Sequence, residues 1–268
     1  MTYIPPTVTE EPVVDEEAVW AWYQNIPEEL ASLNLDAEER DSFTAYYQDA
    51  GLLTRWRREF FRQHYSHPFC RAANHLQASE GQVILDLGCG TGTQALFFAL
   101  RGSRVIGVDM DTVALRVFEK RRKNLQRIAG RALDVSLLDA NVFEVDLSHE
   151  GVTGVYSLFA FNMMQPSTQL LGRISDWATD DVRIAILDGN NQSWLPRLVP
   201  SRRRDVLSPT QFETELRRSG FSIDAHHGGV GLPPLAWLLP SFLAQPLNRR
   251  LCESWLFSVS HLLLASRS

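Results

Sequence analysis

The segment Val83–Gly92, which reads VILDLGCGTG, constrains the fold of this chain more than any other. Its first half is an apolar run, and its second half places glycine at positions 88, 90 and 92. Glycine allows a tight turn and lets a bound molecule approach the backbone more closely than a Cβ atom would permit. A stretch with helical periodicity begins at Thr93. The pattern therefore predicts a buried strand, a glycine-rich binding turn and a helix in succession.

Short apolar runs continue to alternate with helical stretches beyond this segment. The apolar runs predict strands at Val83–Leu87, Ser103–Val108, Ala132–Leu138, Gly154–Phe159 and Val182–Leu187. Helical periodicity at Thr93–Arg101 and at Asp111–Ile128 separates the first three of these strands. Strands that alternate with helices form parallel pairs, because each helical crossover returns the chain to the same end of the sheet. The predicted fold class is therefore α/β, with helices on both faces of a parallel sheet.

The C-terminal part adds a well-delimited helix and two further strands. Ser208 is a suitable N-cap, Pro209 occupies the first helical position, and Gln211 completes a capping box. Gly220 ends the helix. Strand-like runs follow at Phe221–His227 and Leu256–Ala265.

The spacing of the glycines distinguishes between two classes of cofactor. A dinucleotide-binding turn has the pattern Gly-x-Gly-x-x-Gly, which would require glycine at position 93, where this chain has threonine. The pattern here is Gly-x-Gly-x-Gly, with Asp86 just before the first glycine. The spacing therefore disfavours a nicotinamide-dependent oxidoreductase.

The glycine pattern resembles motif I of the class I S-adenosylmethionine-dependent methyltransferases, and the following strand ends add to the resemblance. The second predicted strand runs into Asp109, and the third runs into Asp139. Specific motifs extend over residues 80 to about 190, and beyond them the resemblance is one of general topology. The resemblance implies a Rossmann-like, doubly wound, mostly parallel sheet of about seven strands with an antiparallel last strand, plus N-terminal helices.

The family uses S-adenosyl-L-methionine as its cofactor, and the resemblance implies where the parts of this molecule would bind. The carboxylate of Asp109 would accept hydrogen bonds from the ribose hydroxyls, as an acid does in dinucleotide sites. Asp139 would meet the adenine amino group, and the end of the fourth strand would line the methyl end. The implied cofactor-binding residues are Asp86, Gly88, Cys89, Gly90, Gly92, Asp109, Met110, Asp139, Ala140 and Phe159. The side chain of Cys89 is interpreted as a bystander and not a nucleophile, because that position varies in such loops.

Histidines are the candidates for a base, which methyl transfer to a hydroxyl usually requires. His227 ends the predicted sixth strand, and His64 and His67 flank Tyr65 where the helical region enters the core domain. In the resembling family both places border the acceptor pocket, and we take His227 and His67 as the candidate catalytic residues. The candidate acceptor contacts are Tyr65, Phe161, Met163 and Arg203, the last as a partner for a carboxylate or phosphate. No histidine pair with a glutamate partner has metal-ligand spacing, so no metal is expected.

Composition divides the chain into three parts. Residues 1–17 are expected to form a disordered acidic tail, because clustered Asp, Glu and Pro cannot bury enough surface to become ordered. Residues 18–68 are expected to form an aromatic-rich helical lid. In this lid, Asp36 and Glu39 form a capping box that begins a helix running to Gly51, and a second helix covers Leu52–His64. Residues 69–268 are expected to form the methyltransferase domain that the resemblance implies, with an apolar insertion at about 228–255.

The apolar segment Gly231–Leu247 within this insertion is too short to span a bilayer and contains four prolines. Such an insertion can cover an apolar pocket, form a homodimer interface or make peripheral contact with a membrane. The segment has no Lys or Arg, which weakens attraction to anionic lipid and favours the first two roles.

Charge and cysteine content exclude other classes of protein. The formal net charge of the 268 residues is −6, which argues against a general nucleic-acid binder, and no DNA partner is expected. The three cysteines (Cys70, Cys89 and Cys252) are widely spaced, which predicts neither a disulfide framework nor a zinc site and favours a reducing compartment. The N-terminus lacks the order of charges of a signal peptide, so we expect a cytoplasmic protein.

The sequence therefore predicts an S-adenosylmethionine-dependent methyltransferase for a small, partly hydrophobic or lipid-like acceptor. Oxygen is the favoured acceptor atom, and the methyl group would move by in-line displacement. Two alternatives stay open: a protein or RNA methyltransferase, and a non-catalytic cofactor-binding partner protein of the same fold. The segment Phe161–Pro166 lacks the double proline and aromatic residue of an Asn/Asp-Pro-Pro-Tyr turn. Methylation of nucleic-acid bases or of glutamine is accordingly disfavoured.

Overall fold

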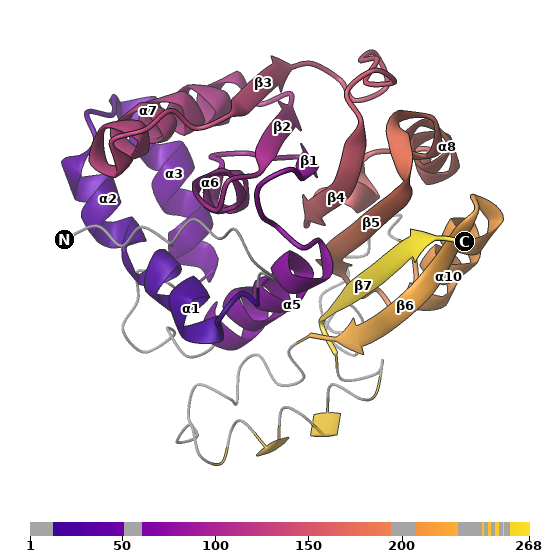
Figure 1. The fold of residues 1–268 in the computed structure, drawn as a ribbon. Helices are drawn as coiled ribbons and strands as arrows, with labels where there is room; N and C mark the ends of the chain where they lie inside the picture. The colour runs from indigo at the N-terminus through magenta and orange to yellow at the C-terminus, as the bar shows by residue number, and fades with distance from the viewer. Residues whose placement is uncertain are drawn as a thin grey trace.

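The computed structural model describes residues 13–50, 61–193, 207–229 and 258–268, with a few single positions between 243 and 254. In this part of the chain, one seven-stranded sheet has the order β3-β2-β1-β4-β5-β7-β6 (Figure 1). The strands are β1 (Val83–Leu87), β2 (Arg104–Asp109), β3 (Val135–Asp139), β4 (Val152–Leu158), β5 (Ala178–Gly189), β6 (Phe221–Gly228) and β7 (Ser260–Arg267).

Strands β1 to β5 pair in parallel, whereas β7 runs antiparallel to both β5 and β6. The predicted fold class, with its antiparallel last strand, is confirmed. The strand order reverses at β1, which pairs with β2 on one side and with β4 on the other. In open α/β sheets, ligands bind outside the carboxyl ends of the strands at such a reversal. The fold therefore directs attention to the segments that follow β1, β2 and β4.

The described helices are α1 (Glu16–Gln24), α2 (Ile26–Ser32), α3 (Ala37–Ala50), the π-helix Arg62–Ser66, α5 (His67–His75), α6 (Thr93–Leu100), α7 (Thr112–Ala129), the 3₁₀-helix Phe161–Met163, α8 (Ser167–Trp177) and α10 (Pro209–Arg218). Capping explains several of their ends. The Asp111 side chain accepts hydrogen bonds from Val113 and Ala114 at the start of α7, and Gly130 ends that helix in the left-handed conformation. The expected capping box of α10, with Ser208 and Gln211, is present.

Two hydrophobic clusters cover the two faces of the sheet. One contains side chains of α1, α3, α5, α6 and α7, and the other contains side chains of α8 and α10. Figure 1 shows these two groups of helices on opposite sides of the sheet. Neighbouring residues of a strand point to opposite faces. On β1, Ile84 accordingly belongs to the first cluster, while Leu85 and Leu87 belong to the second. Asp86 therefore lies on the same face as Ile84, beneath α5 and α6.

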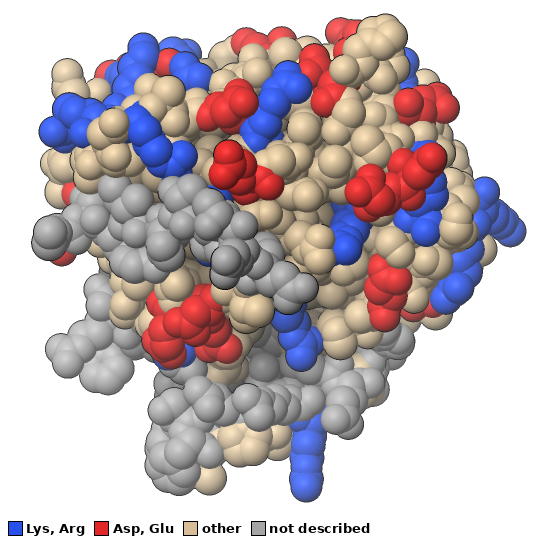
Figure 2. Space-filling model, viewed as in Figure 1, with Lys and Arg blue, Asp and Glu red and all other residues tan. Residues whose placement is uncertain are grey.

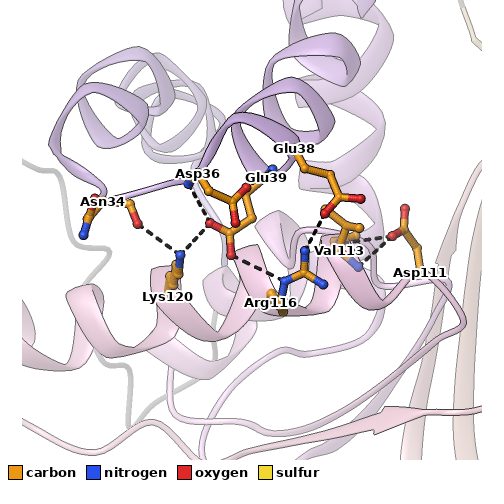
Figure 3. Close-up of polar contacts among 9 residues, drawn as sticks. Asn34, Asp36, Glu38, Glu39, Asp111, Val113, Arg116 and Lys120 are labelled. Carbon is orange, nitrogen blue, oxygen red and sulfur yellow. Dashed lines mark hydrogen bonds and ion pairs between the residues drawn. The ribbon is translucent and has the colours of Figure 1, made fainter.

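Helix α3 docks on α7 through a row of polar contacts (Figure 3). Lys120 of α7 donates hydrogen bonds to the Glu39 carboxylate and, over 3.1 Å, to the Asn34 carbonyl oxygen. Arg116 forms an ion pair of 2.8 Å with Glu38 and a longer one of 3.6 Å with Glu39. Pairs that are exposed to solvent contribute only about 0–1 kcal/mol each. Buried aromatic side chains of the same two helices, such as Phe43 and Phe118, belong to the first cluster.

The N-terminal segment differs from the prediction at several points. The capping box of Asp36 and Glu39 is present, with both hydrogen bonds at 2.9 Å. The predicted disordered tail, in contrast, extends too far, because Val14 is buried and Asp15 caps α1. The predicted helix Leu52–His64 lies mostly outside the described residues.

Two further helices, α5 and α8, were not expected from the sequence, because both depend on packing against the sheet. The apolar insertion also lies largely outside the described residues. Over the described part of the face in Figure 2, Lys and Arg side chains are interspersed with Asp and Glu. None of the described helices has both the length and the apolar composition that are needed to cross a membrane.

Candidate active site

The glycine loop after β1 is strongly curved, and its three glycines serve different purposes. Gly88, Gly90 and Gly92 have φ angles of +73°, +50° and +79°, a region that other residues rarely adopt. A Cβ atom on Gly88 would lie 2.3 Å from the Cβ atom of Ala160, and one on Gly92 would lie 2.4 Å from the Phe118 ring. A Cβ atom on Gly90 would meet no atom within 4 Å. Gly88 and Gly92 are therefore required for packing, whereas Gly90 borders open space.

The first half of the loop is held by the end of β2. The backbone N–H groups of Gly88 and Cys89 donate to the Val108 carbonyl oxygen, over 2.9 and 3.3 Å. The Gly90 N–H donates to Oδ2 of Asp109 over 2.7 Å, and the Asp111 N–H donates to Oδ1 over 2.9 Å. A carboxylate offers about four acceptor positions, so Asp109 retains capacity for further donors such as ribose hydroxyls.

The other expected cofactor-binding residues lie at the carboxyl ends of β2 and β3 or directly after them. Asp109 and Asp139 are paired in the register of the two strands, and the Ala140 N–H donates to the Asp109 carbonyl oxygen over 3.1 Å. The Asp139 side chain is exposed, and Met110 exposes 68% of its surface. The fold thus brings Asp109, Met110, Asp139 and Ala140 to one edge of the sheet.

Asp86 is buried beneath the loop, and one of its carboxylate oxygens has no hydrogen-bond partner. Its Oδ2 atom is inaccessible and unbonded, and so is the hydroxyl of Tyr156, the residue paired with Asp86 across β1 and β4. Burial, with a contribution from the nearby charge of Asp109, raises the pKa of Asp86 to about 8. A buried carboxylate of this kind would be stabilised by a cationic donor.

The side chain of Cys89 packs inside the domain. Its Sγ atom lies over β2, where a Cβ atom on Gly107 would approach it to 2.9 Å. Burial raises the pKa of the Cys89 thiol well above its usual value. A protonated, buried thiol is a poor nucleophile. Only the backbone of Cys89 therefore contributes to the loop.

The chain after β4 packs directly on the glycine loop. Phe159 has a φ angle of +54°, which is uncommon for a bulky residue and costs about 1–3 kcal/mol. Its N–H donates to the Leu187 carbonyl oxygen over 2.7 Å, which joins the ends of β4 and β5. Strained backbone of this kind clusters at ligand sites. Phe159 and the adjacent Ala160, which contacts Gly88, therefore link the loop to the region beyond β4.

An aromatic cluster forms over Phe159. The imidazole of His64 stacks on the Phe159 ring at 5.4 Å between centroids, and the Tyr65 ring meets Phe159 edge-on at 5.6 Å. Both residues belong to the π-helix Arg62–Ser66, a conformation that is frequent at functional sites. Phe61 stacks on Tyr65 at 4.6 Å. We call Phe61, His64, Tyr65 and Phe159 the aromatic cluster.

His64 is the buried polar group of this cluster. Its Nδ1 atom lies 3.4 Å from the Ser260 hydroxyl at the start of β7. Burial lowers the pKa of His64 to about 4, so the ring is neutral at neutral pH. A neutral imidazole can accept a proton at one nitrogen and donate from the other. His64 is therefore a buried, neutral polar group at the end of β4.

The predicted acceptor residues do not all meet at this place. His67 forms an ion pair of 2.6 Å with Glu16 at the junction of α1 and α5. Phe161, predicted as an acceptor contact, is fully buried and packs edge-on against Phe212 in the cluster of α8 and α10. Phe161 is thus a core residue. The 3₁₀-turn after β4 directs its side chain to the face of the sheet opposite the aromatic cluster. Met163 exposes 72% of its surface.

His227 and Arg203 complete the list of predicted residues. His227 is partly buried near the end of β6, and burial, together with the charges of Arg71 and His226, lowers its pKa. Arg203 lies outside the described residues. Of the two histidines that flank Tyr65, the structure thus brings His64 rather than His67 to the end of β4.

Within the described ranges, no three His, Cys, Asp or Glu side chains are grouped so that they could hold a metal ion. Ser260 was missed by the sequence analysis, since it follows an apolar stretch far along the chain and carries no local motif. The contact between His64 and Ser260 spans 196 positions.

Comparisons with known proteins agree with this geometry. Residues 84–180 match a family described as "Methyltransferase domain". A demethylmenaquinone methyltransferase from Streptomyces avermitilis is 28% identical over 170 residues, which cover 63% of this chain and 64% of that protein. The matched stretches span less than two thirds of the length of the first curated relatives.

Solved structures of the same fold cover more of the chain. A SAM-dependent methyltransferase from Aquifex aeolicus has a TM-score of 0.53 at 14% identity and covers 82% of this chain and 98% of its own. A geranyl diphosphate C-methyltransferase from Streptomyces coelicolor A3(2), solved with S-adenosyl-L-homocysteine, has a TM-score of 0.57 at 19% identity and covers 76% of each chain. The chain therefore has the class I methyltransferase fold, and residues 84–180 within it are similar to the methyltransferase-domain family.

Proposed function

We propose that this protein is an S-adenosylmethionine-dependent methyltransferase that acts on a small, partly hydrophobic acceptor with a planar ring. The observation that carries the proposal is the open side of the glycine loop at Gly90, with Asp109 bonded to it at the end of β2. This arrangement lies at the strand-order reversal, where a cofactor binds in this class of fold.

The residues present suit the parts of this cofactor. The spare acceptor capacity of Asp109 suits a ribose, and the buried carboxyl group of Asp86 lies directly beneath the loop. The exposed side chains of Met110 and Asp139 are available to a purine ring and its amino group. Because Gly88 has no side chain, Ala160 and Met164 can approach the loop. This contact supports a position for the methyl group of the cofactor beside the aromatic cluster.

When bound, S-adenosylmethionine supplies a methyl group on a sulfonium, whose carbon–sulfur bond breaks as the bond to the acceptor forms. The contribution of the chain is to align the two partners and exclude water. For a hydroxyl acceptor, a proton must also leave, and His64, whose ring stacks on Phe159, is one candidate to accept it, although its lowered pKa of about 4 makes it a weak base. His227 remains a second candidate at the same edge of the sheet.

The aromatic cluster supports a flat acceptor. Ring faces of Tyr65 and Phe159 favour offset or edge-on contact with another ring. The demethylmenaquinone methyltransferases among the relatives act, by their names, on a quinone-type molecule. A reduced naphthoquinone is therefore our first choice of acceptor, with its oxygen as the favoured atom and a ring carbon as the alternative.

The test is transfer of a labelled methyl group from S-adenosylmethionine to a panel of acceptors. The panel contains 1,4-naphthoquinols with short isoprenoid chains, simple phenols, total RNA and a protein extract. We expect labelled product from the quinols or phenols, and magnetic resonance of the product then assigns oxygen or carbon. Label only in RNA or protein would contradict the small-molecule acceptor, and cofactor binding without any transfer would favour a non-catalytic protein.

A further inference from the structure

The second half of the glycine loop is held from outside the sheet by a buried arginine. Thr91 and Thr93 lie on either side of Gly92, and both bind Arg121 of α7. Nη1 of Arg121 donates to the Thr91 carbonyl oxygen over 2.8 Å and to the Thr93 hydroxyl over 2.7 Å. The arginine side chain is fully buried. None of the residues assigned above to cofactor binding takes part in these contacts.

The other edge of the guanidinium group is bound by helix α2. Nε and Nη2 of Arg121 donate to the two carboxylate oxygens of Glu29, over 2.9 and 2.8 Å. Glu29 is buried as well, and the Phe43 ring of α3 lies 4.7 Å from the guanidinium carbon. Burial acts to lower the pKa of Arg121, but the Glu29 carboxylate outweighs it and raises that pKa. The arginine is therefore a charged bridge between α2 and the loop.

Helices α1 and α3 reach the same threonine. The indole Nε1 of Trp22 donates to the Thr93 carbonyl oxygen over 3.1 Å, and the Tyr47 hydroxyl is hydrogen-bonded to the Thr93 hydroxyl. Thr93 is also the first residue of α6. Buried hydrogen bonds to charged groups are strong, and losing one partner leaves the other unsatisfied. The second half of the loop therefore cannot shift unless α1, α2 and α3 shift with it.

We propose that Arg121 is a positioning residue for the cofactor, which makes the shape of the glycine loop depend on the docking of α1–α3. The inference rests on the proposed function, because it takes an adenosyl cofactor as the ligand of the loop. Arg121 acts through Thr91 and Thr93 and holds the backbone on both sides of Gly92. Coupling of this kind is reciprocal, so cofactor binding at the loop stabilises the docked helices by the same factor.

The test compares S-adenosylhomocysteine affinity between matched variants of the full chain by calorimetric titration. Thr93→Val keeps the side-chain volume but removes the hydroxyl, whereas Thr93→Ser keeps the hydroxyl. We expect Thr93→Val to weaken binding about tenfold, which equals about 1.4 kcal/mol, and Thr93→Ser to restore most of the affinity. Tyr47→Phe, which removes only the hydroxyl next to Thr93, is the second variant if Thr93→Val fails to fold.

The control is Arg116→Gln, which breaks the exposed ion pair with Glu38 between the same two helices, α7 and α3 (Figure 3). It should leave the affinity unchanged.

Hydrogen exchange gives a second readout: in the wild type, S-adenosylhomocysteine should slow exchange of the amides in α2 and α3, and Thr93→Val should abolish this effect. Absence of binding to the wild type would overturn the proposed function. Wild-type affinity in both Thr93→Val and Tyr47→Phe would overturn the role of Arg121 but would leave the proposed function standing.

Discussion

The two sides of the candidate active site are held by different kinds of contact. On the cofactor side, the first half of the glycine loop is fixed by backbone donors to Val108 and Asp109, which follow it closely in the chain. On the proposed acceptor side, the stacked rings of His64 and Phe159 join segments that are far apart in sequence, and Ser260 comes from a third segment. Short backbone hydrogen bonds give a rigid surface, whereas aromatic packing can adjust to different ring systems. We infer that the cofactor side fixes the chemistry and the acceptor side selects the substrate.

The largest effect on ligand binding should come from filling the open side of the loop. Gly90→Val places a side chain where no protein atom lies within 4 Å, so the fold should tolerate it apart from the backbone strain of its positive φ angle. We expect affinity for S-adenosylhomocysteine to fall by about 100-fold or more, or about 2.7 kcal/mol, in a calorimetric titration.

The matched control for this variant is Gly151→Val. Gly151 has a φ angle of +66° and equally open surroundings but precedes β4 at the amino ends of the strands. It should lose similar stability and bind the ligand normally. Equal affinity in both variants would mean that the ligand does not bind over Gly90.

The second effect concerns the buried carboxyl group of the cofactor side. Folding raises the pKa of Asp86 from 3.8 to about 8. The contribution of this carboxyl group to the free energy of unfolding is therefore greatest below pH 3.8 and is lost as the pH rises through 8. Raising the pH from 5 to 9 should therefore destabilise the wild type by roughly 2–5 kcal/mol more than it destabilises Asp86→Asn. Urea unfolding of the ligand-free protein at both pH values measures the difference. A difference between the two proteins that does not change with pH would show that Asp86 titrates normally.

The third effect tests the acid at the end of β2. Asp109→Ala removes the acceptor for the Gly90 N–H and the site expected for ribose hydroxyls, so binding should weaken by about 1–3 kcal/mol. Asp176→Ala, at an exposed position on α8, is the control and should bind normally. Calorimetry with adenosine as a second ligand sharpens the assignment, since adenosine should lose affinity by the same factor. Unchanged affinity for both ligands would remove Asp109 from the site.

The smallest effect should be on turnover from the acceptor side. His64→Gln should lower methyl transfer to a quinol by about tenfold or more if the ring takes the acceptor proton. His227→Gln tests the second candidate in the same assay, and the exposed His149 provides a control as His149→Gln. Cofactor affinity should stay unchanged in all three variants. A larger loss in His227→Gln than in His64→Gln would move the base from the aromatic cluster to the end of β6.

The same comparison explains what the sequence could predict. The strand–loop–helix unit at residues 83–100 and the acids at positions 109 and 139 follow local rules, because each motif lies on one strand end and the parallel sheet aligns those ends. The glycines at 88, 90 and 92 report the backbone geometry directly. The strands of the sheet could therefore be predicted, although β3, β5 and β7 begin three or four residues from the predicted positions.

The acceptor side could not be predicted in this way. The sequence analysis took His67 rather than His64 as a candidate base, and no local signal distinguished the two. The π-helix and the docking of α1 separate them, because Glu16 binds His67. Phe161 and Phe159 both follow β4, yet the positive φ angle of Phe159 and the following turn direct their rings to opposite faces. The bond between Arg121 and Glu29 spans 92 positions and has no local signature. Contacts of this range depend on the packed structure.

The measurement that tests the central claim most directly is calorimetric titration of the wild-type chain with S-adenosylmethionine, S-adenosylhomocysteine and NAD in parallel. Our account predicts that both adenosyl ligands bind with one site per chain and that NAD does not, because position 93 is threonine and a dinucleotide turn requires glycine there. Binding of NAD alone, or of none of the three ligands, would contradict the assignment of the glycine loop as a methyl-donor site.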